Sequence, residues 1–422
     1  MRIAIASACY PPETVVAGRM SYDLACYLLK EGHEVRVICP YPTRVAGLSV
    51  TDSKPQRVLS TAIDQGVTVI RVPSYTAPLS RLLPRMRESW SYGRWTAHVL
   101  QQSEWKAQAL YEDAWPMLAQ AWISKTAQRL GITRVAHIMD LYPESAFIKY
   151  PQWLGSLFGK PLLQLDKANA LRAAKILVLS EQMRQVYEST RHVPAEQLEI
   201  IPPWQDEAPF LKAPDRQEAA RQYKVRADLF TFLYLGNIGP VAGVGHLIQS
   251  FGRAALPQAQ LLIIGEGSEK EACVKLAKGT SDKIVFLTEP DVRKVPLLQA
   301  LADVCLLPMR RGSGVSSIPS KLSAYMLSGK PVLASVDDES ETARVIHAAD
   351  CGWVTEPENI EALCDQMRRL AVPGAGILAA NGDKGRKYAL AHLSRSSGVQ
   401  KMASILLEAA RKTEQFLEGN RP

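Results

Sequence analysis

Short apolar runs alternate with longer stretches of helical periodicity through the first half of the chain. The short runs are rich in β-branched residues and predict strands, whereas apolar positions recurring at helical spacing predict helices. We expect a first helix over 19–30 and strands at 2–7, 34–39, 67–72, 136–139, 176–179 and 198–202. This alternation is typical of a parallel sheet covered by helices.

The alternation breaks after residue 200 and then resumes. Ile201-Pro202-Pro203-Trp204 and the polar residues 205–207 interrupt it. The second series predicts helices at 245–254 and 269–278 and strands at 230–235, 260–264, 284–287, 303–307 and 331–335. We therefore predict an α/β protein with two doubly wound domains, 1–206 and 207–385, and a helical segment over 386–422 that packs back on the first domain.

Size and charge narrow the classes of partner. A chain of 422 residues with 47% hydrophobic and 22% charged residues suits two globular domains. The net charge of +8 indicates an anionic partner: nucleotide phosphates, an acidic membrane surface or nucleic acid. Nucleic acid is disfavoured because the basic residues are dispersed and no recognition motif is present.

Hydropathy and cysteine usage predict a cytoplasmic protein. The apolar run 295–308 is too short to cross a bilayer and contains Asp303. The first residues lead into Tyr10-Pro11-Pro12 rather than into a signal-peptide cleavage site. Seven cysteines without Cys-x-x-Cys spacing and seven scattered histidines predict buried free thiols and no metal site.

Residues 313–331 join a loop of small residues to the start of a helix. Pro319 suits the first turn of a helix, where unpaired amides and the helix dipole favour an anion, and Lys321 would add a full charge. We expect a phosphate site here; an ordinary capped helix with a solvated lysine is the alternative. Arg310 is a further candidate unless it belongs to a solvated loop. The other candidate contacts are Gly314, Ser316, Ser317 and Ser320.

Polar residues follow several predicted strands, at the edge where doubly wound sheets bind ligands. Asn237 and Gly239 follow the strand 230–235, and Glu266 follows the next strand, where it would face a nucleoside or cap a helix. Asp140 follows the strand 136–139; its carboxylate would face an acceptor hydroxyl or donor sugar, or would cap the loop. We expect the active site in the cleft between the domains.

Several motifs together resemble a known enzyme family. They are Tyr10-Pro11-Pro12-Glu13 with Gly18, Lys30-Glu31-Gly32-His33-Glu34-Val35, Asp140-Leu141-Tyr142-Pro143-Glu144-Ser145, Tyr234-Leu235-Gly236-Asn237-Ile238-Gly239, Ile264-Gly265-Glu266-Gly267, and Pro319-Ser320-Lys321 with Gly329-Lys330-Pro331-Val332. Their order and spacing resemble GT-B glycosyltransferases nearly end to end. The chain is similar to the retaining family 4 group, particularly its bacterial polysaccharide branch with colanic-acid and O-antigen fucosyl or N-acetylfucosaminyl transferases.

This resemblance implies two Rossmann-like domains that face each other across a cleft. It implies metal-independent, retaining transfer of a deoxy or acetamido hexose from a nucleotide diphosphate, a UDP-sugar rather than a GDP-sugar, bound by the second domain. The acceptor would be lipid-linked or a polysaccharide precursor. Asp140 and Lys321 would be the catalytic residues, and the first domain would contact the acceptor through Tyr10, Gly18, Arg19, Trp115 and Glu144.

The chain departs from this family at four positions. Relatives carry a pair of glutamates where this chain has Ser316 and Ala324, and an arginine and a lysine where it has Asn237 and Ala242. Within the acidic segment 337–342, Glu339 and Thr342 are candidate substitutes for the donor contacts. The alternative is that this segment is a solvated loop that caps the next helix. A non-catalytic scaffold, or an epimerase or phosphorylase on the same fold, therefore remains open.

Residues 81–95 mix arginines with leucines and aromatic residues. Leu83, Trp90 and Trp95 alternate with Arg87 and Arg94, a pattern suited to the surface of an anionic bilayer. Aromatic residues at helical spacing also occur in protein cores, which is the alternative. We expect peripheral contact with the cytoplasmic face of the inner membrane.

Overall fold

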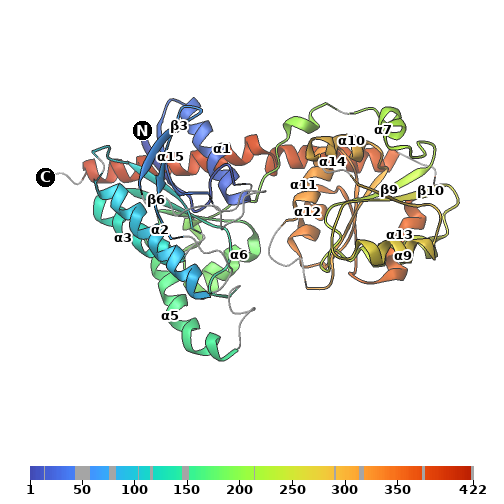
Figure 1. Ribbon diagram of the computed structural model, residues 1–422, viewed down its shortest axis with the longest axis horizontal. Coiled ribbons are helices and arrows are strands. Elements are labelled where there is room, and N and C mark those ends of the chain that lie inside the picture. The colour runs from blue at the N-terminus through green and yellow to red at the C-terminus, as the bar shows by residue number, and fades with distance from the viewer. Residues whose placement is uncertain are drawn as a thin grey trace. The chain divides into compact units, whose positions relative to one another are not determined.

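Figure 1 shows a computed structural model of the chain. The structure describes residues 1–13, 15–42, 58–75, 82–102, 104–114, 117–144, 152–212, 214–288, 291–312, 318–372 and 376–419. The chain divides into unit 1, which is Met1–Pro203 with Gly398–Pro422, and unit 2, which is Trp204–Ser397. The boundary thus follows Pro203 rather than residue 206. Residues 386–397 belong to unit 2 and not to the segment expected to pack on the first domain.

Unit 1 is built on an eight-stranded sheet in the order β3-β4-β2-β1-β5-β6-β7-β8. Only β3 is antiparallel to its neighbour among these strands, which are β1 (Arg2–Ala6), β2 (Glu34–Pro40), β3 (Ser60–Asp64), β4 (Val67–Val72), β5 (Ala109–Asp113), β6 (Thr133–Ile138), β7 (Lys175–Val178) and β8 (Leu198–Ile200). The sequence pattern predicted neither β3 nor β5. In the buried β5, Glu112 pairs with Arg134 of β6 at 2.5 Å, so a charged residue fits inside the sheet.

Helices cover both faces of this sheet (Figure 1). They are α1 (Val16–Lys30), α2 (Leu82–Gln102), α3 (Met117–Leu130), α5 (Gln152–Ala170), α6 (Glu181–Val186) with a π-helical turn Tyr187–Arg191, and the last part of α15 (Arg395–Gly419). Helices α2 and α3 lie side by side and bury Tyr92 and Ile123 against the sheet. Helix α15 buries Val399, Met402 and Leu406.

Unit 2 contains a fully parallel six-stranded sheet in the order β11-β10-β9-β12-β13-β14. Its strands are β9 (Phe230–Leu235), β10 (Ala259–Ile264), β11 (Ile284–Leu287), β12 (Val304–Pro308), β13 (Val332–Ser335) and β14 (Gly352–Thr355). Its helices are α7 (Arg216–Tyr223), α8 (Val244–Ala254), α9 (Lys270–Lys278), α10 (Val295–Ala300), α11 (Ser320–Leu327), α12 (Glu341–Ala349), α13 (Ile360–Leu370) and α14 (Gly376–His392). The five strands predicted for this domain are all present, and β14 is an addition.

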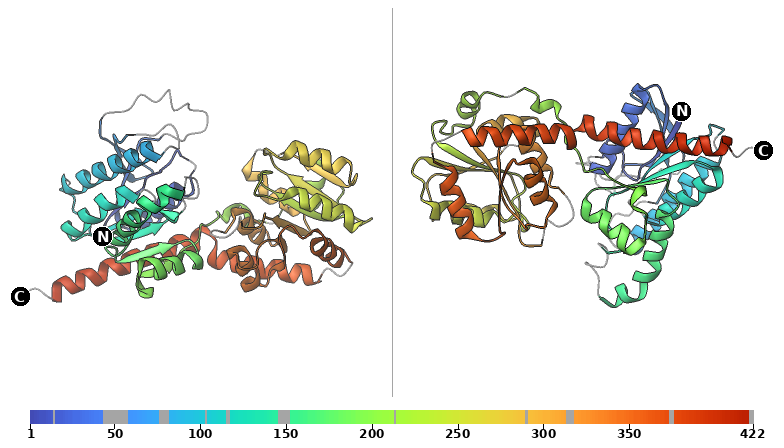
Figure 2. Two further views of the ribbon diagram at one scale, coloured as in Figure 1. Left: turned by 90° about the horizontal axis from the view of Figure 1, so that it is seen from below. Right: turned by 180° about the vertical axis from the view of Figure 1, so that it is seen from behind.

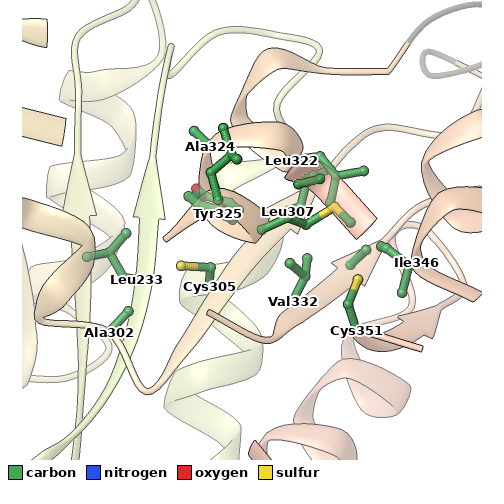
Figure 3. Packing of buried hydrophobic residues seen from close by; sticks show 14 of the residues in the cluster. Leu233, Ala302, Cys305, Leu307, Leu322, Ala324, Tyr325, Val332, Ile346 and Cys351 are labelled. Carbon is green, nitrogen blue, oxygen red and sulfur yellow. The ribbon is translucent and has the colours of Figure 1, made fainter. Parts of the chain in front are cut away.

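Two apolar layers enclose the sheet of unit 2. Figure 3 shows one of them, in which Leu322 and Tyr325 of α11 pack on Leu233, Leu307 and Val332 of the strands. The opposite layer joins α8, α9 and α13 to the other face of the sheet. Helix α11 is therefore fixed by its buried face while its first turn remains at the carboxyl edge of the sheet.

The chain passes from unit 1 to unit 2 after Pro203 and returns after Ser397. The residues of unit 2 next to these two points form hydrogen bonds with one another. The amide of Gln205 donates to Leu393 O at 2.9 Å, and the amide of Arg395 donates to Gln205 O at 2.9 Å. Glu207 accepts from the amides of Arg395 and Ser396 at 2.9 and 3.2 Å. Helix α15 begins at this junction and can be followed as the long red helix in Figure 2. No helix within the described ranges is long and apolar enough to cross a membrane.

Candidate functional site

Lys321 lies in the first turn of α11 and extends to the carboxyl end of β9. Its Nζ donates to the hydroxyl of Tyr234 at 3.2 Å and lies 4.6 Å from the centre of that ring. Among the residues that the structure describes, no carboxylate forms an ion pair with it. Burial lowers the pKa of Lys321 to about 8. A largely buried ammonium without a protein counter-ion is suited to an anionic ligand.

The first turn of α11 has no side-chain cap among the described residues. Its N-cap is Pro319, which provides no side-chain hydrogen bond, and its first turn contains no acidic residue. By contrast, Ser340 caps α12 by accepting from the amide of Ala343, and Asn359 caps α13 in the same way. The amide of Leu322 donates to Pro319 O at 2.9 Å, so the amides of the exposed Ser320 and of Lys321 are the ones that could bind an anion. Gly314, Ser316 and Ser317 lie outside the described residues.

Two glycine-rich loops continue side by side beyond β9 and β10. The amide of Gly236 donates to Ile264 O at 2.9 Å, and the amide of Ile238 donates to Glu266 O at 2.8 Å. A Cβ on Gly265 would lie 1.9 Å from Gly236 O, and one on Gly267 would lie 2.2 Å from Ile238 O. Both glycines also have positive φ, so the loops can approach this closely only without side chains.

Asn237 and Gly239 occupy the loop after β9. The side chain of Asn237 is exposed, and its main-chain oxygen accepts from the Tyr234 hydroxyl at 2.6 Å. The side-chain nitrogen Nδ2 of Asn237 lies 2.9 Å from the position that a Cβ on the buried Gly239 would occupy. Helix α8 begins after this loop at Gly243, again without a side-chain cap. A second open helix start therefore belongs to unit 2.

Glu266 and Arg310 are both exposed and both bound to protein neighbours. Glu266 accepts from Lys270 at 2.6 Å and from Thr288 at 2.9 Å, and these hydrogen bonds lower its pKa. Arg310 pairs with Glu269 at 3.2 Å. Glu266 does not cap α9, whose N-cap is Glu269. The helix-cap alternative for Glu266 is therefore wrong, and a nucleoside contact stays a prediction.

The two candidate substitutes near α12 differ in exposure. Glu339 is exposed, whereas Thr342 is fully buried in the first turn of the helix. Because Thr342 is fully buried, it cannot contact a ligand directly in this structure. The helix-capping alternative for the acidic segment is confirmed for Ser340, which caps α12.

In unit 1, the loop after β1 packs tightly against α1. Tyr10 is 1% exposed, and the guanidinium of Arg71 lies 5.8 Å from the centre of its ring. A Cβ on Gly18 would lie 2.8 Å from Cys9 O, so Gly18 permits this close packing. Arg19 is exposed on α1. Tyr10 and Gly18 thus have roles in packing. Their predicted contact with the acceptor stays a prediction. Trp115 lies outside the described residues.

Asp140 and Glu144 follow β6 and differ in their surroundings. Asp140 is exposed. Glu144 accepts from Arg191 through both carboxylate oxygens, at 2.5 and 2.8 Å, and Arg191 is fully buried. Burial alone would raise the pKa of Glu144, but its hydrogen bonds from Arg191 lower it. Arg191 also donates to Tyr142 O at 2.7 Å and to Asp166 at 2.9 Å. The loop that carries Asp140 is therefore anchored by Glu144.

Potential metal ligands are dispersed in the part of the chain that the structure describes. No three His, Cys, Asp or Glu side chains lie together there in a way that could hold a metal ion. The described cysteines are free, and most are buried.

Both units match models of known families. Residues 17–208 match the model described as Glycosyltransferase Family 4, and residues 215–371 match Glycosyl transferases group 1. The chain belongs to the GT-B glycosyltransferases. A relative in Escherichia coli K12, WcaI, is named as a glycosyl transferase of colanic acid biosynthesis; it is 24% identical over 92% of this chain and 95% of its own length. WbjE of Pseudomonas aeruginosa, named as a glycosyltransferase, is 23% identical over 56% of this chain and 58% of its own length.

Solved structures share the fold of this glycosyltransferase. Sucrose-phosphate synthase from Thermosynechococcus elongatus has a TM-score of 0.70 at 16% identity, covering 97% of this chain and 98% of its own. HepE of Anabaena, solved in complex with UDP, has a TM-score of 0.67 at 16% identity and covers 97% of this chain and 100% of its own. These similarities support the predicted GT-B architecture.

Three of the four positions at which this glycosyltransferase departs from the family pattern lie within the described residues. Ala324 is 7% exposed and packs in the core layer of α11, and Ala242 is 8% exposed beside α8. Both alanines therefore fill apolar space at positions where the family resemblance implied charged residues. Ser316 lies outside the described residues, and Asn237 is exposed.

The sequence pattern missed several polar residues near strand ends of this glycosyltransferase. Tyr111 and His137 form a buried pair at 2.8 Å, and burial lowers the pKa of His137 to about 4, so the ring is neutral. Ser7 lies 3.5 Å from the buried Asp113. Arg191 was also missed, because no local spacing distinguishes it from other helix residues. Tyr234 opens the motif 234–239, but the sequence pattern gave it no role in the site. Asp113 could have been found only from its place as the last residue of β5, at the edge where such sheets bind ligands.

Proposed function

We propose that this glycosyltransferase takes its sugar from a nucleoside diphosphate donor, whose diphosphate binds at the first turn of α11 and Lys321. The observation that carries this proposal is the largely buried ammonium of Lys321, without a carboxylate partner among the described residues, beside a helix start without a side-chain cap. Fixed amides and a buried cation stabilise a diphosphate without reorganisation. The parallel loops after β9 and β10 would receive the nucleoside.

The proposed chemistry needs no metal ion. As the glycosidic bond of the donor breaks, negative charge builds on the leaving diphosphate, and Lys321 with the α11 amides would stabilise it. Asp140, exposed after β6, would bind an acceptor hydroxyl or the donor sugar. Retention of configuration is part of this proposal and rests on the likeness to the retaining family 4 group.

We also propose that the donor is a UDP-sugar with a deoxy or acetamido hexose, and that the acceptor is lipid-linked or a polysaccharide precursor. HepE, which shares the fold, was solved with UDP and with UDP-glucose. The name of WcaI refers to colanic acid, a polysaccharide. The HepE complexes support UDP as the nucleotide, and the name of WcaI supports a polysaccharide-precursor acceptor. The choice of a deoxy or acetamido hexose and of a lipid-linked acceptor rests on the family resemblance.

A basic aromatic surface on α2 and α3 supports membrane contact. Trp90 and Trp122 are 43% and 39% exposed, and their ring centres lie 6.1 Å apart. Leu83 is 75% exposed on the same helix as Trp90, and Arg94 lies 5.4 Å from the Trp90 ring. Exposed tryptophans beside arginines suit the interface of an anionic bilayer. Trp95, in contrast, packs partly in the core.

Vesicle sedimentation tests this surface. We expect the protein to sediment with phosphatidylglycerol-containing vesicles and not with phosphatidylcholine vesicles. The double variant Trp90→Ala, Trp122→Ala should lose about tenfold in affinity. Ile63→Ala, which removes an exposed apolar side chain on β3, is the control and should bind as the native protein does. Equal sedimentation of the double variant and the native protein would contradict membrane contact through this surface.

Calorimetric titration tests the donor site. UDP, GDP, dTDP and ADP are titrated into the native protein and into Lys321→Ala. We expect UDP to bind selectively and the variant to lose binding by about a hundredfold, because a charged hydrogen-bonded contact is removed. If none of the four nucleotides binds the native protein, the donor site is wrong, and a scaffold on the same fold becomes the better description.

A further inference from the structure

Tyr234 connects Lys321 to the loop after β9. Its side chain is fully buried in β9, and its hydroxyl accepts from Lys321 Nζ at 3.2 Å. The same hydroxyl donates to Asn237 O at 2.6 Å. Its ring lies beneath the ammonium, 4.6 Å from the centre to Nζ. One side chain thus contacts both parts of the proposed donor site.

The hydrogen-bond directions follow from the chemistry of the groups. A tyrosine hydroxyl has one proton, and Asn237 O is an acceptor only, so this proton goes to Asn237. The hydroxyl oxygen is then an acceptor for the ammonium of Lys321, which is a donor only. A hydrogen bond from a charged donor is stronger than one between neutral groups, and the face of the ring adds a cation–π attraction.

Two further ionisable groups near Tyr234 are neutral. Cys273 of α9 and Tyr325 of α11 are the ionisable neighbours of Tyr234, and burial raises the pKa of each. Burial also raises the pKa of Tyr234 itself. The Tyr325 hydroxyl is bound to the main chain of Leu235, at 2.9 Å to its nitrogen and 3.2 Å to its oxygen. Among the described residues, Tyr234 is therefore the side chain that hydrogen-bonds the ammonium of Lys321.

We propose that Tyr234 is a positioning residue of the donor site: it keeps Lys321 protonated and directed at the diphosphate, and couples it to the loop that begins at Gly236. This inference rests on the proposed function and adds to it a role for Tyr234, a motif residue to which the sequence pattern assigned no function. Loss of the hydroxyl should weaken nucleotide binding mainly by changing the pH range over which Lys321 is charged.

The test compares Tyr234→Phe with Tyr325→Phe. Both substitutions remove one buried hydroxyl at the contact between α11 and β9, but only Tyr234 contacts Lys321. UDP and GDP are titrated by calorimetry into the native protein and both variants between about pH 6 and pH 9.5, a range that brackets the pKa of Lys321 near 8.

We expect the affinity of the native protein to fall above about pH 8, where free Lys321 loses its proton. In Tyr234→Phe the fall should begin about one pH unit lower, and at pH 7.5 the affinity should be about threefold to tenfold weaker. Tyr325→Phe should follow the native pH profile. Identical profiles for Tyr234→Phe and the native protein would overturn the inference and leave the donor site standing. Absence of UDP and GDP binding to the native protein would overturn both.

A measurement without nucleotide separates this effect from a folding defect. Lysines are reductively methylated with ¹³C, and the signal that is missing in Lys321→Ala identifies Lys321. Its pKa should be lower in Tyr234→Phe than in the native protein and in Tyr325→Phe. An unchanged pKa in a folded Tyr234→Phe protein would reject the role of Tyr234 whatever the nucleotide data give.

Discussion

At the scale of single residues, the charge of Lys321 works against folding while it prepares a site for an anion. Burial lowers its pKa to about 8, so the folded chain disfavours the ammonium relative to the unfolded chain. Tyr234 offsets part of this cost. A lysine kept in such a place without a carboxylate partner in the described structure is typical of a ligand site rather than of a structural contact.

Lys321→Met should therefore stabilise the protein and impair nucleotide binding. The free energy of unfolding should rise by about 1–3 kcal/mol at pH 7, because the penalty for a charged lysine is fully present below its folded pKa. The gain should shrink as pH rises from about 8 and disappear above about 10.5, where both states of the native lysine are neutral. Urea unfolding across this pH range measures it. A variant less stable than the native protein at pH 7 would show that Lys321 has a stabilising partner.

At the scale of elements, three loops at the carboxyl ends of the sheets are each held by a contact from another element. In unit 2 the loops after β9 and β10 are joined by main-chain hydrogen bonds that glycine permits. In unit 1 the loop after β6 is held by Arg191, from the π-helical turn after α6. The predicted catalytic residue Asp140 therefore depends on a helix turn distant from it in sequence.

Replacement of Arg191 tests this anchor. Arg191→Met should lower the free energy of unfolding by about 3–5 kcal/mol, mainly because the buried Asp166 loses its counter-ion, and the more exposed Glu144 loses it as well. The control is Arg184→Met on α6, whose partly exposed pair with Glu188 should contribute less than about 1 kcal/mol. Chemical denaturation measures both. Equal effects would mean that the loop after β6 does not depend on Arg191.

At the scale of the whole molecule, the donor site as described lies entirely within unit 2. Lys321, Tyr234 and the glycine loops all belong to Trp204–Ser397. Unit 1 contributes Asp140 and the basic aromatic surface of α2 and α3. The proposed donor contacts therefore belong to unit 2, and the proposed acceptor and membrane contacts belong to unit 1.

Hydrogen exchange measured by mass spectrometry tests this division. UDP should slow amide exchange by about tenfold or more at the start of α11 and in the loops after β9 and β10. The β-sheet core of unit 1 and the surface of α2 and α3 should exchange as they do without nucleotide. Lys321→Ala is the control in which this protection should be lost. Protection confined to unit 1 would contradict the assignment of the donor to unit 2.

Local patterns were sufficient for much of the architecture and for part of the site. Alternating apolar runs predicted both sheets, because a strand buried on both faces must be apolar along its length. The helix start at Pro319 was predicted from proline and lysine in one turn, and the structure leaves that turn without a cap. The strand β5 was missed because its last residues, Glu112 and Asp113, interrupt the apolar run.

The sequence by itself determined two doubly wound domains, the main strand and helix boundaries, and the candidate phosphate position at Lys321, because each of these depends on neighbours within a few residues. Only the tertiary structure decided what surrounds them. Lys321 and Tyr234 are separated by 87 positions, and Arg191 and Glu144 by 47. Burial of Thr342 and exposure of Trp90 and Trp122 were settled in the same way. Such contacts arise from how strands and helices pack, and the periodicity of one segment carries no information about which distant side chain it will meet.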